Sequence, residues 1–404
     1  MSRPYQSSSS AALHGARTRA GVHGSLVPSI VPSTTFLRDG LDDGAAFAYS
    51  RVGNPTVAAL EAQLGALEET EHALAFSSGL AAETTLLLAT LRAGDHIACG
   101  RAAYGGTVRL LRETLAGLGV EASFFDSTNP AALAAAIRPN TKVVFVETPA
   151  NPTLALTDIE GAARLAHTAG AILVVDNTFL TPVLQRPLDL GADVCVSSTT
   201  KFIEGHSAAV GGVVTTRDGS LAARVDRVRK SIGTIQTPFN AWVTLQGAKT
   251  LPLRLGQQSR HAARIAALLA SDPRIERVHY PGLRGFAQAD IARRQHLGAH
   301  GAVVSFEAPG GLQGADAAVR ALALCSVVEH VGSVETLVTH SASMTHADVP
   351  REQRLAVGIT DGLLRISVGL EDPEEIIADL DRAIDAAASV AASSEGRALC
   401  TSGV

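Results

Sequence analysis

Short, continuous hydrophobic runs dominate the middle of the chain. They occupy residues 143–146, 172–175 and 194–196, and polar residues follow each run at once. Strands that are buried on both faces give this pattern, and such strands belong to parallel sheets that helices cover. Between the first two runs, residues 158–169 have a helical hydrophobic period that Gly170 closes. The pattern therefore predicts an α/β domain with a mostly parallel sheet.

Polar side chains stand at the predicted carboxyl ends of these strands, where ligands bind in open parallel sheets. Lys201 follows the third run, and a lysine that forms a Schiff base with a carbonyl compound suits this position. The hydroxyl groups of Ser198 and Thr200 suit a phosphate, and Asp176 suits a protonated ring nitrogen. Together these residue types indicate pyridoxal phosphate (PLP) chemistry. The alternatives are a solvated surface lysine and an aspartate that caps a helix.

The flanking segments suggest how the chain divides into domains. Residues 1–45 lack a helical or strand period and are predicted to form an extended arm. Residues 46–245 contain the predicted sheet, and Ser78 precedes a helix whose first amides suit an anion. Residues 246–404 alternate helices and short strands, which predicts a smaller α+β domain.

Composition and charge exclude several classes of protein. The 404 residues carry 34 Lys+Arg and 39 Asp+Glu, a net charge of −5, so nucleic acid is not an expected partner. No window is a continuous apolar span, and no secretory signal precedes the first domain, so a membrane location is not expected. Four scattered cysteines favour a reducing compartment, and we expect a cytoplasmic protein. No ligand spacing predicts a metal site.

Seven ordered motifs between about residues 20 and 385 resemble one enzyme family. The motifs are FAYSRVGNPT (47–56), FSSGLAA (76–82), AYGGTVR (103–109), ETPANPT (147–153), VVDNTFLTP (174–182), SSTTKFIEGHS (197–207) and LLRISVGLED (363–372). They are similar to the cysteine/methionine-metabolism, or trans-sulfuration, family of PLP-dependent enzymes. The resemblance implies fold type I, which is the α/β fold of aspartate aminotransferase, and a homotetramer of two catalytic dimers.

The resemblance also implies roles for individual residues. Lys201 matches the lysine that holds PLP as an internal aldimine, Asp176 the partner of the pyridine nitrogen, and Tyr104 the tyrosine that stacks on the ring and serves as an auxiliary acid or base. Asn151 matches the residue near the phenolic oxygen of PLP, and Arg365 the residue that binds the substrate α-carboxylate. The residues that match the phosphate site are Gly79, Leu80, Ser198 and Thr200 from the same chain, and Tyr49 and Arg51 from the neighbouring subunit.

The choice of substrate within the family depends on fewer positions. Arg109, Glu335 and the adjacent Thr336 match positions that the cystathionine γ-enzymes use for the distal end of their substrate, so cystathionine γ-synthase or γ-lyase activity is expected. Cystathionine β-lyase, methionine γ-lyase and O-acyl-homoserine sulfhydrylase remain alternatives, as does a non-catalytic protein with the PLP fold. The chain departs from the family pattern at Ala48, Ala208, His330 and Ser333, and at Thr336, where the family commonly has serine.

Overall fold

The computed structural model describes residues 5, 7–16, 24–41 and 44–401. The chain divides into two compact units. Unit 1 reaches to Thr148 and resumes from Thr157 to Leu253, and unit 2 comprises Pro149–Leu156 and the chain from Arg254 onward. Among the described residues, no helix has the length and apolar character needed to cross a membrane.

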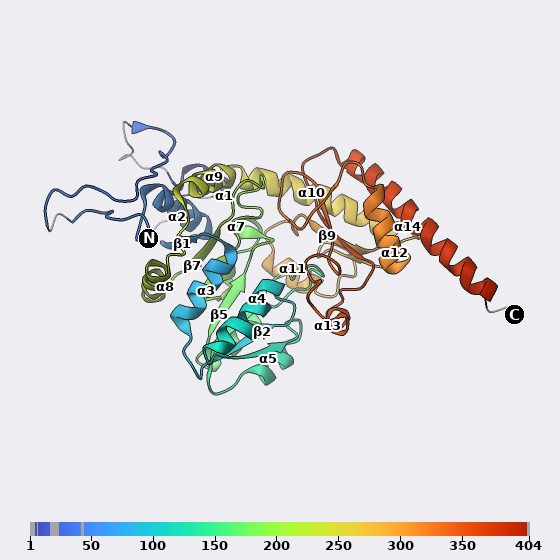
Figure 1. Cartoon of the computed structure of the whole chain (residues 1–404), viewed down its shortest axis with the longest axis horizontal. Helices are drawn as coiled ribbons and strands as arrows, with labels where there is room; N and C mark the ends of the chain where they lie inside the picture. The colour runs from blue at the N-terminus through green and yellow to red at the C-terminus, as the bar shows by residue number, and fades with distance from the viewer. Residues whose placement is uncertain (1–4, 6, 17–23, 42–43, 402–404) are drawn as a thin grey trace. The chain divides into compact units, whose positions relative to one another are not determined.

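Unit 1 is built on a seven-stranded sheet in the order β1-β7-β6-β5-β4-β2-β3 (Figure 1). The five strands from β6 to β3 are parallel, and β7 pairs antiparallel with both β6 and β1. The mostly parallel sheet expected from the hydrophobic runs is confirmed. The strands are β1 (His72–Phe76), β2 (His96–Gly100), β3 (Glu121–Phe125), β4 (Thr141–Glu147), β5 (Ile172–Asp176), β6 (Val194–Ser197) and β7 (Gly212–Thr216).

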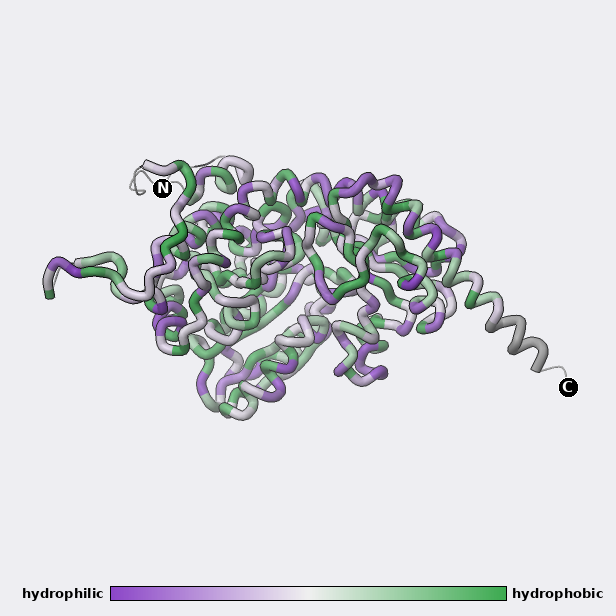
Figure 2. Tube along the Cα trace, turned by 45° about the horizontal axis from the view of Figure 1, so that its top comes forward, coloured by the Kyte–Doolittle hydropathy of each residue, from purple (hydrophilic) through white to green (hydrophobic). Residues whose placement is uncertain are grey.

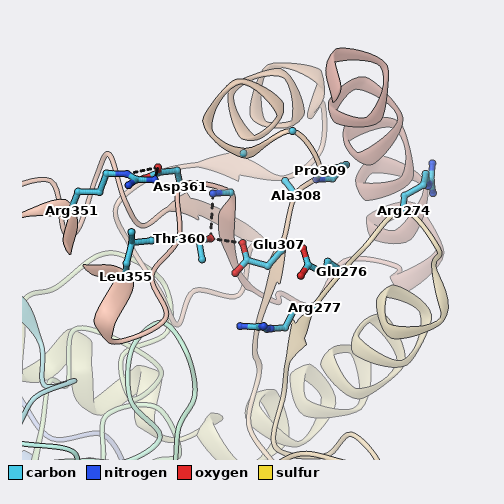
Figure 3. A pocket seen from close by; sticks show the side chains of 13 residues that line it. Arg274, Glu276, Arg277, Glu307, Ala308, Pro309, Arg351, Leu355, Thr360 and Asp361 are labelled. Atoms are coloured by element: carbon cyan, nitrogen blue, oxygen red, sulfur yellow. Dashed lines mark hydrogen bonds and ion pairs between the residues drawn. The ribbon is translucent and has the colours of Figure 1, made fainter. Parts of the chain in front are cut away.

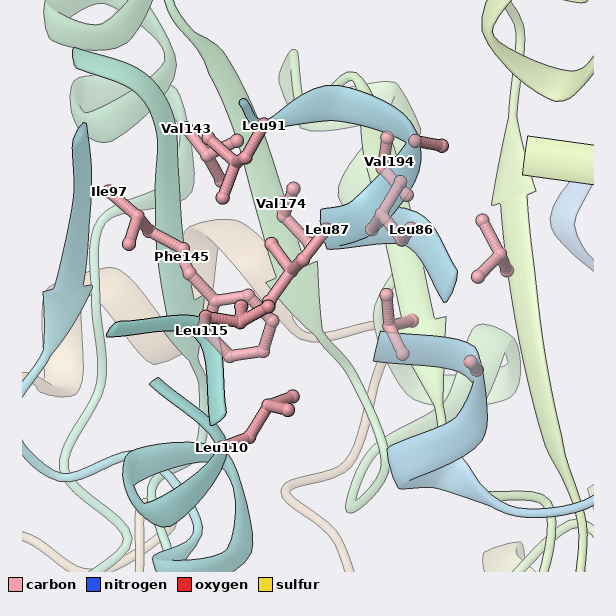
Figure 4. Packing of buried hydrophobic residues seen from close by; sticks show 14 of the residues in the cluster. Leu86, Leu87, Leu91, Ile97, Leu110, Leu115, Val143, Phe145, Val174 and Val194 are labelled. Atoms are coloured by element: carbon pink, nitrogen blue, oxygen red, sulfur yellow. The ribbon is translucent and has the colours of Figure 1, made fainter. Parts of the chain in front are cut away.

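Helices cover both faces of this sheet, and alternate strand residues enter two separate cores. Val143 and Phe145 of β4 pack with residues of α3, η2 and α8 (Figure 4), whereas Val144 and Val146 pack with residues of α5 and α6. Both faces are therefore buried, which explains the continuous apolar runs. The helices are α1 (Ser8–His14), α2 (Pro55–Glu68), α3 (Gly79–Thr90), α4 (Gly105–Arg109), the π-helical η2 (Leu110–Leu115), α5 (Pro130–Ala136), α6 (Ile159–Thr168), α7 (Thr181–Leu184), η3 (Pro187–Leu190), α8 (Gly219–Ile232) and α9 (Pro238–Ala248).

Unit 2 contains a five-stranded sheet in the order β10-β11-β12-β9-β8. Phe306, Leu364 and Ile366 face a core with α10, α12 and α14, so the period of two places Ser305 and Arg365 on the opposite, polar face. The strands are β8 (Val278–His279), β9 (Val303–Glu307), β10 (Ser326–Val327), β11 (Leu337–His340) and β12 (Leu363–Ser367), and the helices are α10 (Leu251–Ser271), α11 (Ala289–Gln295), α12 (Gly311–Ala321), α13 (Arg351–Ala356) and α14 (Pro373–Thr401).

The N-terminal arm contains more regular structure than its sequence suggested. Ser8–His14 forms α1, which Ser7 caps and which packs on α2 through buried Ala11 and Ala12, so the absence of a helical period did not exclude a helix. The segment before α2 projects as a loop with exposed hydrophobic stretches (Figure 2), including fully exposed Leu37 and Leu41. The rest of the predicted arm, residues 1–4, 6, 17–23 and 42–43, lies outside the described residues.

Candidate active site

The strand ends of unit 1 bring the predicted polar residues to one edge of the sheet. Asp176 and Glu147 are directly paired in register at the ends of β5 and β4, and β6 ends beside them at Ser197. Lys201 lies in the turn after β6, where its amide donates to the carbonyl of Ser198 at 3.2 Å and its side chain is half-buried. Lys201 and Asp176 thus follow neighbouring strands, as their spacing predicted.

Lys201 differs from the other lysines of the chain, of which there are three. Lys142 is exposed within β4, Lys230 forms an ion pair on α8, and Lys249 follows α9. Lys201 is therefore the one lysine at the carboxyl ends of the parallel strands, where the chemistry of such sheets takes place.

Asp176 is a buried carboxyl group, 7% exposed, that receives a hydrogen bond from the amide of Thr178 at 2.9 Å. Burial raises its pKa above the ordinary value. None of the ion pairs among the described residues supplies a cation to it. A protonated ring nitrogen would provide the missing positive charge, so the surroundings of Asp176 fit PLP.

The N-terminus of α3 forms a cradle that fits a phosphate. Ser78 caps the helix by accepting the amide of Ala81 at 3.0 Å, which leaves the first two amides, those of Gly79 and Leu80, directed out of the helix end. A Cβ atom on Gly79 would lie 2.9 Å from the Cβ atom of Ser198, so only glycine lets Ser198 approach this closely. The cradle and Ser198 are therefore adjacent, as the phosphate assignment requires.

Thr200 and Thr178 hydrogen-bond to the backbone around the strand ends, and the expected phosphate contact of Thr200 stays a prediction. The hydroxyl of Thr200 donates to the carbonyl of Gly211 at 3.1 Å and accepts the amide of Gly211 at 2.9 Å, so it fixes the loop before β7. Thr178, which sequence reasoning missed, accepts the amide of Ser198 at 2.8 Å while its own amide binds Asp176. Its position two residues after a strand-end aspartate is the only signal the sequence gives.

Tyr104 begins α4 and is held close to the phosphate cradle. Its amide donates to the Oε2 atom of Glu147 at 2.7 Å, and its side chain is 41% exposed. A Cβ atom on Gly106 would lie 2.5 Å from Cε1 of Tyr104 and 3.0 Å from Cδ1 of Leu80. The tyrosine ring therefore lies against Gly106 beside the cradle and is partly exposed. Arg109 ends the same helix and is exposed.

Tyr49 and Arg51 interact with each other at the base of the projecting loop. The guanidinium lies 5.2 Å from the centre of the tyrosine ring and donates to the carbonyl of Lys230 at 2.7 Å. Among the described residues, neither side chain hydrogen-bonds to Lys201 or Ser198 of the same chain. Their expected contribution to a neighbouring subunit stays a prediction.

Unit 2 fixes Arg365 on the polar face of its sheet. The side chain is 2% exposed and donates to the Oδ1 atom of Asn151, the carbonyl of His330 and the hydroxyl of Thr339, each at 2.8 Å. Three of its N–H groups thus hold the guanidinium in a fixed orientation, which suits recognition of a planar carboxylate. Asn151 and His330 act here as supports of that arginine.

Glu335 and Thr336 are neighbours with different surroundings. Glu335 is exposed, whereas Thr336 is 1% exposed. The Thr336 hydroxyl donates to Glu371 at 2.7 Å and accepts a hydrogen bond from the amide of Gly369 at 2.9 Å. These hydrogen bonds stabilise the loop that contains Thr336. The expected substrate contact of Thr336 stays a prediction.

The departure at Ala208 is offset within the same loop. The Oε2 atom of Glu204 accepts hydrogen bonds from the amides of His206 and Ala208, both at 3.1 Å. The loop after Lys201 therefore keeps a carboxylate although residue 208 has none.

A separate pocket of about 480 Å³ lies in unit 2 near the start of α12 (Figure 3). Thr360 donates to Glu307 in its wall, and Arg351 pairs with Asp361 at its edge. None of the sequence-predicted site residues lines it. We assign no function to it.

A strand-end lysine, a buried carboxylate one strand away and an open helix N-terminus are the parts that a PLP enzyme requires. Residues 9–385 match the family of Cys/Met metabolism PLP-dependent enzymes, and the chain belongs to that family. The predicted resemblance, the α/β fold and PLP as the cofactor are thereby confirmed.

Several relatives are similar over most of their length. The chain is 44% identical to cystathionine gamma-lyase of Mus musculus over 88% of this chain and 89% of that one. It is 40% identical to L-methionine gamma-lyase of Fusobacterium nucleatum subsp. polymorphum over 93% and 97%. The crystal structure of cystathionine gamma synthase from Xanthomonas oryzae pv. oryzae in complex with aminoacrylate and cysteine superposes with a TM-score of 0.93 at 38% identity, covering 96% of this chain and all of the other. The chain is thus a PLP-dependent enzyme of the trans-sulfuration type.

Proposed function

We propose that the protein acts on the γ-carbon of sulfur amino acids or homoserine esters, as a cystathionine γ-lyase or γ-synthase. The observation that carries the proposal is the placement of Lys201, the one lysine at the strand ends, after the strand next to the one that ends at the buried carboxyl group of Asp176. The identities of 44% to a cystathionine gamma-lyase and of 38% to a cystathionine gamma synthase support the substrate class.

PLP, when bound, would supply an aldehyde group for the substrate amine and an electron sink for the reaction at the α-carbon. The Lys201 amine would take the proton from the substrate α-carbon and, before the γ-substituent leaves, a second proton from the β-carbon. Asp176 holds a proton on the ring nitrogen, because its buried carboxylate needs a cation beside it. Arg365 binds the substrate α-carboxylate through its fixed guanidinium, and the Tyr104 hydroxyl protonates the leaving sulfur or oxygen.

Arg109 and Glu335 are assigned to the distal amino-acid end of the substrate. Both are exposed and carry opposite charges, which suits a zwitterion. Gly105 follows Tyr104 in this chain, whereas the methionine γ-lyases of the family carry a cysteine at this position. Gly105 therefore disfavours methionine γ-lyase activity. Ala48 removes an acidic contact near Tyr49, so selectivity for cystathionine should be looser than in relatives, and Ala48→Glu should sharpen it.

The assembly is assigned as a homotetramer of catalytic dimers. Tyr49 and Arg51 lie next to a projecting loop with fully exposed Leu37 and Leu41, and burial of such residues favours association with a second copy. In that assembly the Tyr49–Arg51 pair would bind the phosphate of the neighbouring subunit.

Product identification tests the reaction most simply. Purified protein loaded with PLP is incubated with cystathionine, with O-succinylhomoserine plus cysteine, with O-acetylhomoserine plus sulfide, and with methionine. The proposal expects 2-oxobutanoate from cystathionine, or cystathionine from the second mixture. Pyruvate and homocysteine from cystathionine would instead identify a β-lyase, and exclusive turnover of the third or fourth mixture a sulfhydrylase or a methionine γ-lyase. Turnover of none would favour the non-catalytic alternative.

A further inference from the structure

Glu83 is a buried carboxyl group that none of the roles above uses. It lies on α3, one turn after Gly79 of the phosphate cradle, and is 3% exposed. Its Oε2 atom accepts a hydrogen bond from the hydroxyl of Thr107 at 2.7 Å. Thr107 is buried on α4, one turn after Tyr104. The Glu83–Thr107 bond therefore joins the helix of the cradle to the helix that begins at the stacking tyrosine.

The surroundings of Glu83 are acidic. Burial, and next the charge of Asp176 on β5, raise the pKa of Glu83. Cys99 on β2 is a buried thiol whose pKa is raised by burial and by the charges of Glu83 and of Glu147 on β4. Among the described residues no ion pair gives Glu83 or Asp176 a cation. Two neighbouring, buried carboxyl groups without a cation cannot both ionise at moderate cost, because each would be desolvated beside a like charge.

We propose that Glu83 is a positioning residue for PLP. Glu83 stays protonated, holds α4 against α3 through Thr107, and leaves Asp176 as the one carboxylate that faces the ring nitrogen. The inference rests on the proposed role of Asp176. Glu83 keeps its proton throughout the reaction, and the charge of Asp176 is balanced by the ring. Ionisation of Glu83 would add a second negative charge beside Asp176 and change the environment of the ring.

The test follows the visible circular dichroism of the PLP-loaded protein from about pH 6 to about pH 10. The wild type should show an alkaline component that Glu83→Gln lacks, since the amide keeps an acceptor for Thr107 but cannot ionise. At neutral pH, Glu83→Gln should bind PLP within about twofold of the wild type, because it removes no charge. Thr107→Val removes the donor that favours the carboxylate, so it should move the component to higher pH and weaken PLP binding by about 2- to 13-fold. Thr107→Ser should restore both properties.

Two results would overturn the inference. An unchanged alkaline profile in Glu83→Gln would show that a different group titrates, and a loss of PLP affinity above about tenfold at neutral pH would show that the charge itself is needed. If Glu83→Gln does not fold, Thr107→Val decides, because an unmoved profile contradicts the role of Glu83 and a profile moved upward supports it. A wild type with no visible PLP signal would contradict the proposed function instead.

Discussion

Gly106→Ala should damage the enzyme through Tyr104 alone. The new methyl group would lie 2.5 Å from Cε1 of Tyr104, whereas carbon atoms pack at about 3.5–4.0 Å, so the ring must move by about 1 Å. Leu80 at 3.0 Å from the same position blocks part of that movement. A displacement of about 1 Å costs roughly 100-fold in kcat/KM when the displaced group takes part in the chemistry. Lost stacking of about 0.5–1.5 kcal/mol should raise the Kd for PLP by about 2- to 13-fold.

The matched control is Gly117→Ala, because a Cβ atom on Gly117 meets no atom within 4 Å. Both variants exchange a glycine for an alanine in the same helical stretch, about three turns apart, and the control should keep full activity. Tyr104 is 41% exposed and its ring can shift toward solvent, so Gly106→Ala should unfold at nearly the wild-type temperature. Steady-state kinetics, PLP titration and thermal unfolding measure the three quantities. Wild-type kcat/KM in a folded Gly106→Ala protein would refute the contact between the ring and Gly106 as a requirement for catalysis.

Three further predictions concern the substrate, the assembly and acid stability. Glu335→Ala should lower kcat/KM for cystathionine by about 10- to 150-fold, which is the value of one charge-assisted hydrogen bond. The same variant should leave kcat/KM unchanged for a short substrate without a distal amine. Equal losses on both substrates would show that Glu335 supports the fold and does not bind the distal end. Mixing inactive Arg51→Ala with inactive Lys201→Ala subunits should restore some activity through hybrid dimers, and no recovery after proven subunit exchange would contradict a shared site. Burial lowers the pKa values of His296, to about 3, and of His300, whose Nδ1 atoms lie 3.0 Å apart. The unfolded chain therefore binds protons more readily, so the free energy of unfolding from urea titrations should fall as the pH drops below about 6.5 toward 3, and a pH-independent value would contradict the buried neutral pair.

Hydrophobic runs predicted the centre of the sheet because burial on both faces leaves a continuous apolar signal. The runs at 143–146, 172–175 and 194–196 became β4, β5 and β6, and the helical period at 158–169 became α6. Such a run does not indicate the direction of the strand, because a buried antiparallel strand has the same composition. The reversed strand β7 therefore had no distinguishing signal.

The sequence predicts some residues of the candidate site and not others. Lys201 and Asp176 were predictable because each follows its own strand, so position along the chain sufficed. Thr178, Glu147 and Glu83 were missed because each acts through a hydrogen bond to another element, and sequence spacing does not report such contacts. The hydrogen bonds of the Thr336 and Thr200 hydroxyls to the backbone of a nearby loop could not be predicted from the sequence either.

The central claim is that Lys201 holds PLP at the ends of the parallel strands. Borohydride reduction of the PLP-loaded protein makes the link between lysine and cofactor permanent, and peptide mass spectrometry then locates it among the four lysines of the chain. The account predicts a pyridoxyl group on Lys201 and none on exposed Lys142, with loss of the visible band in Lys201→Ala. A modification on Lys142, Lys230 or Lys249 in place of Lys201, or no stable modification after loading with PLP, would contradict it.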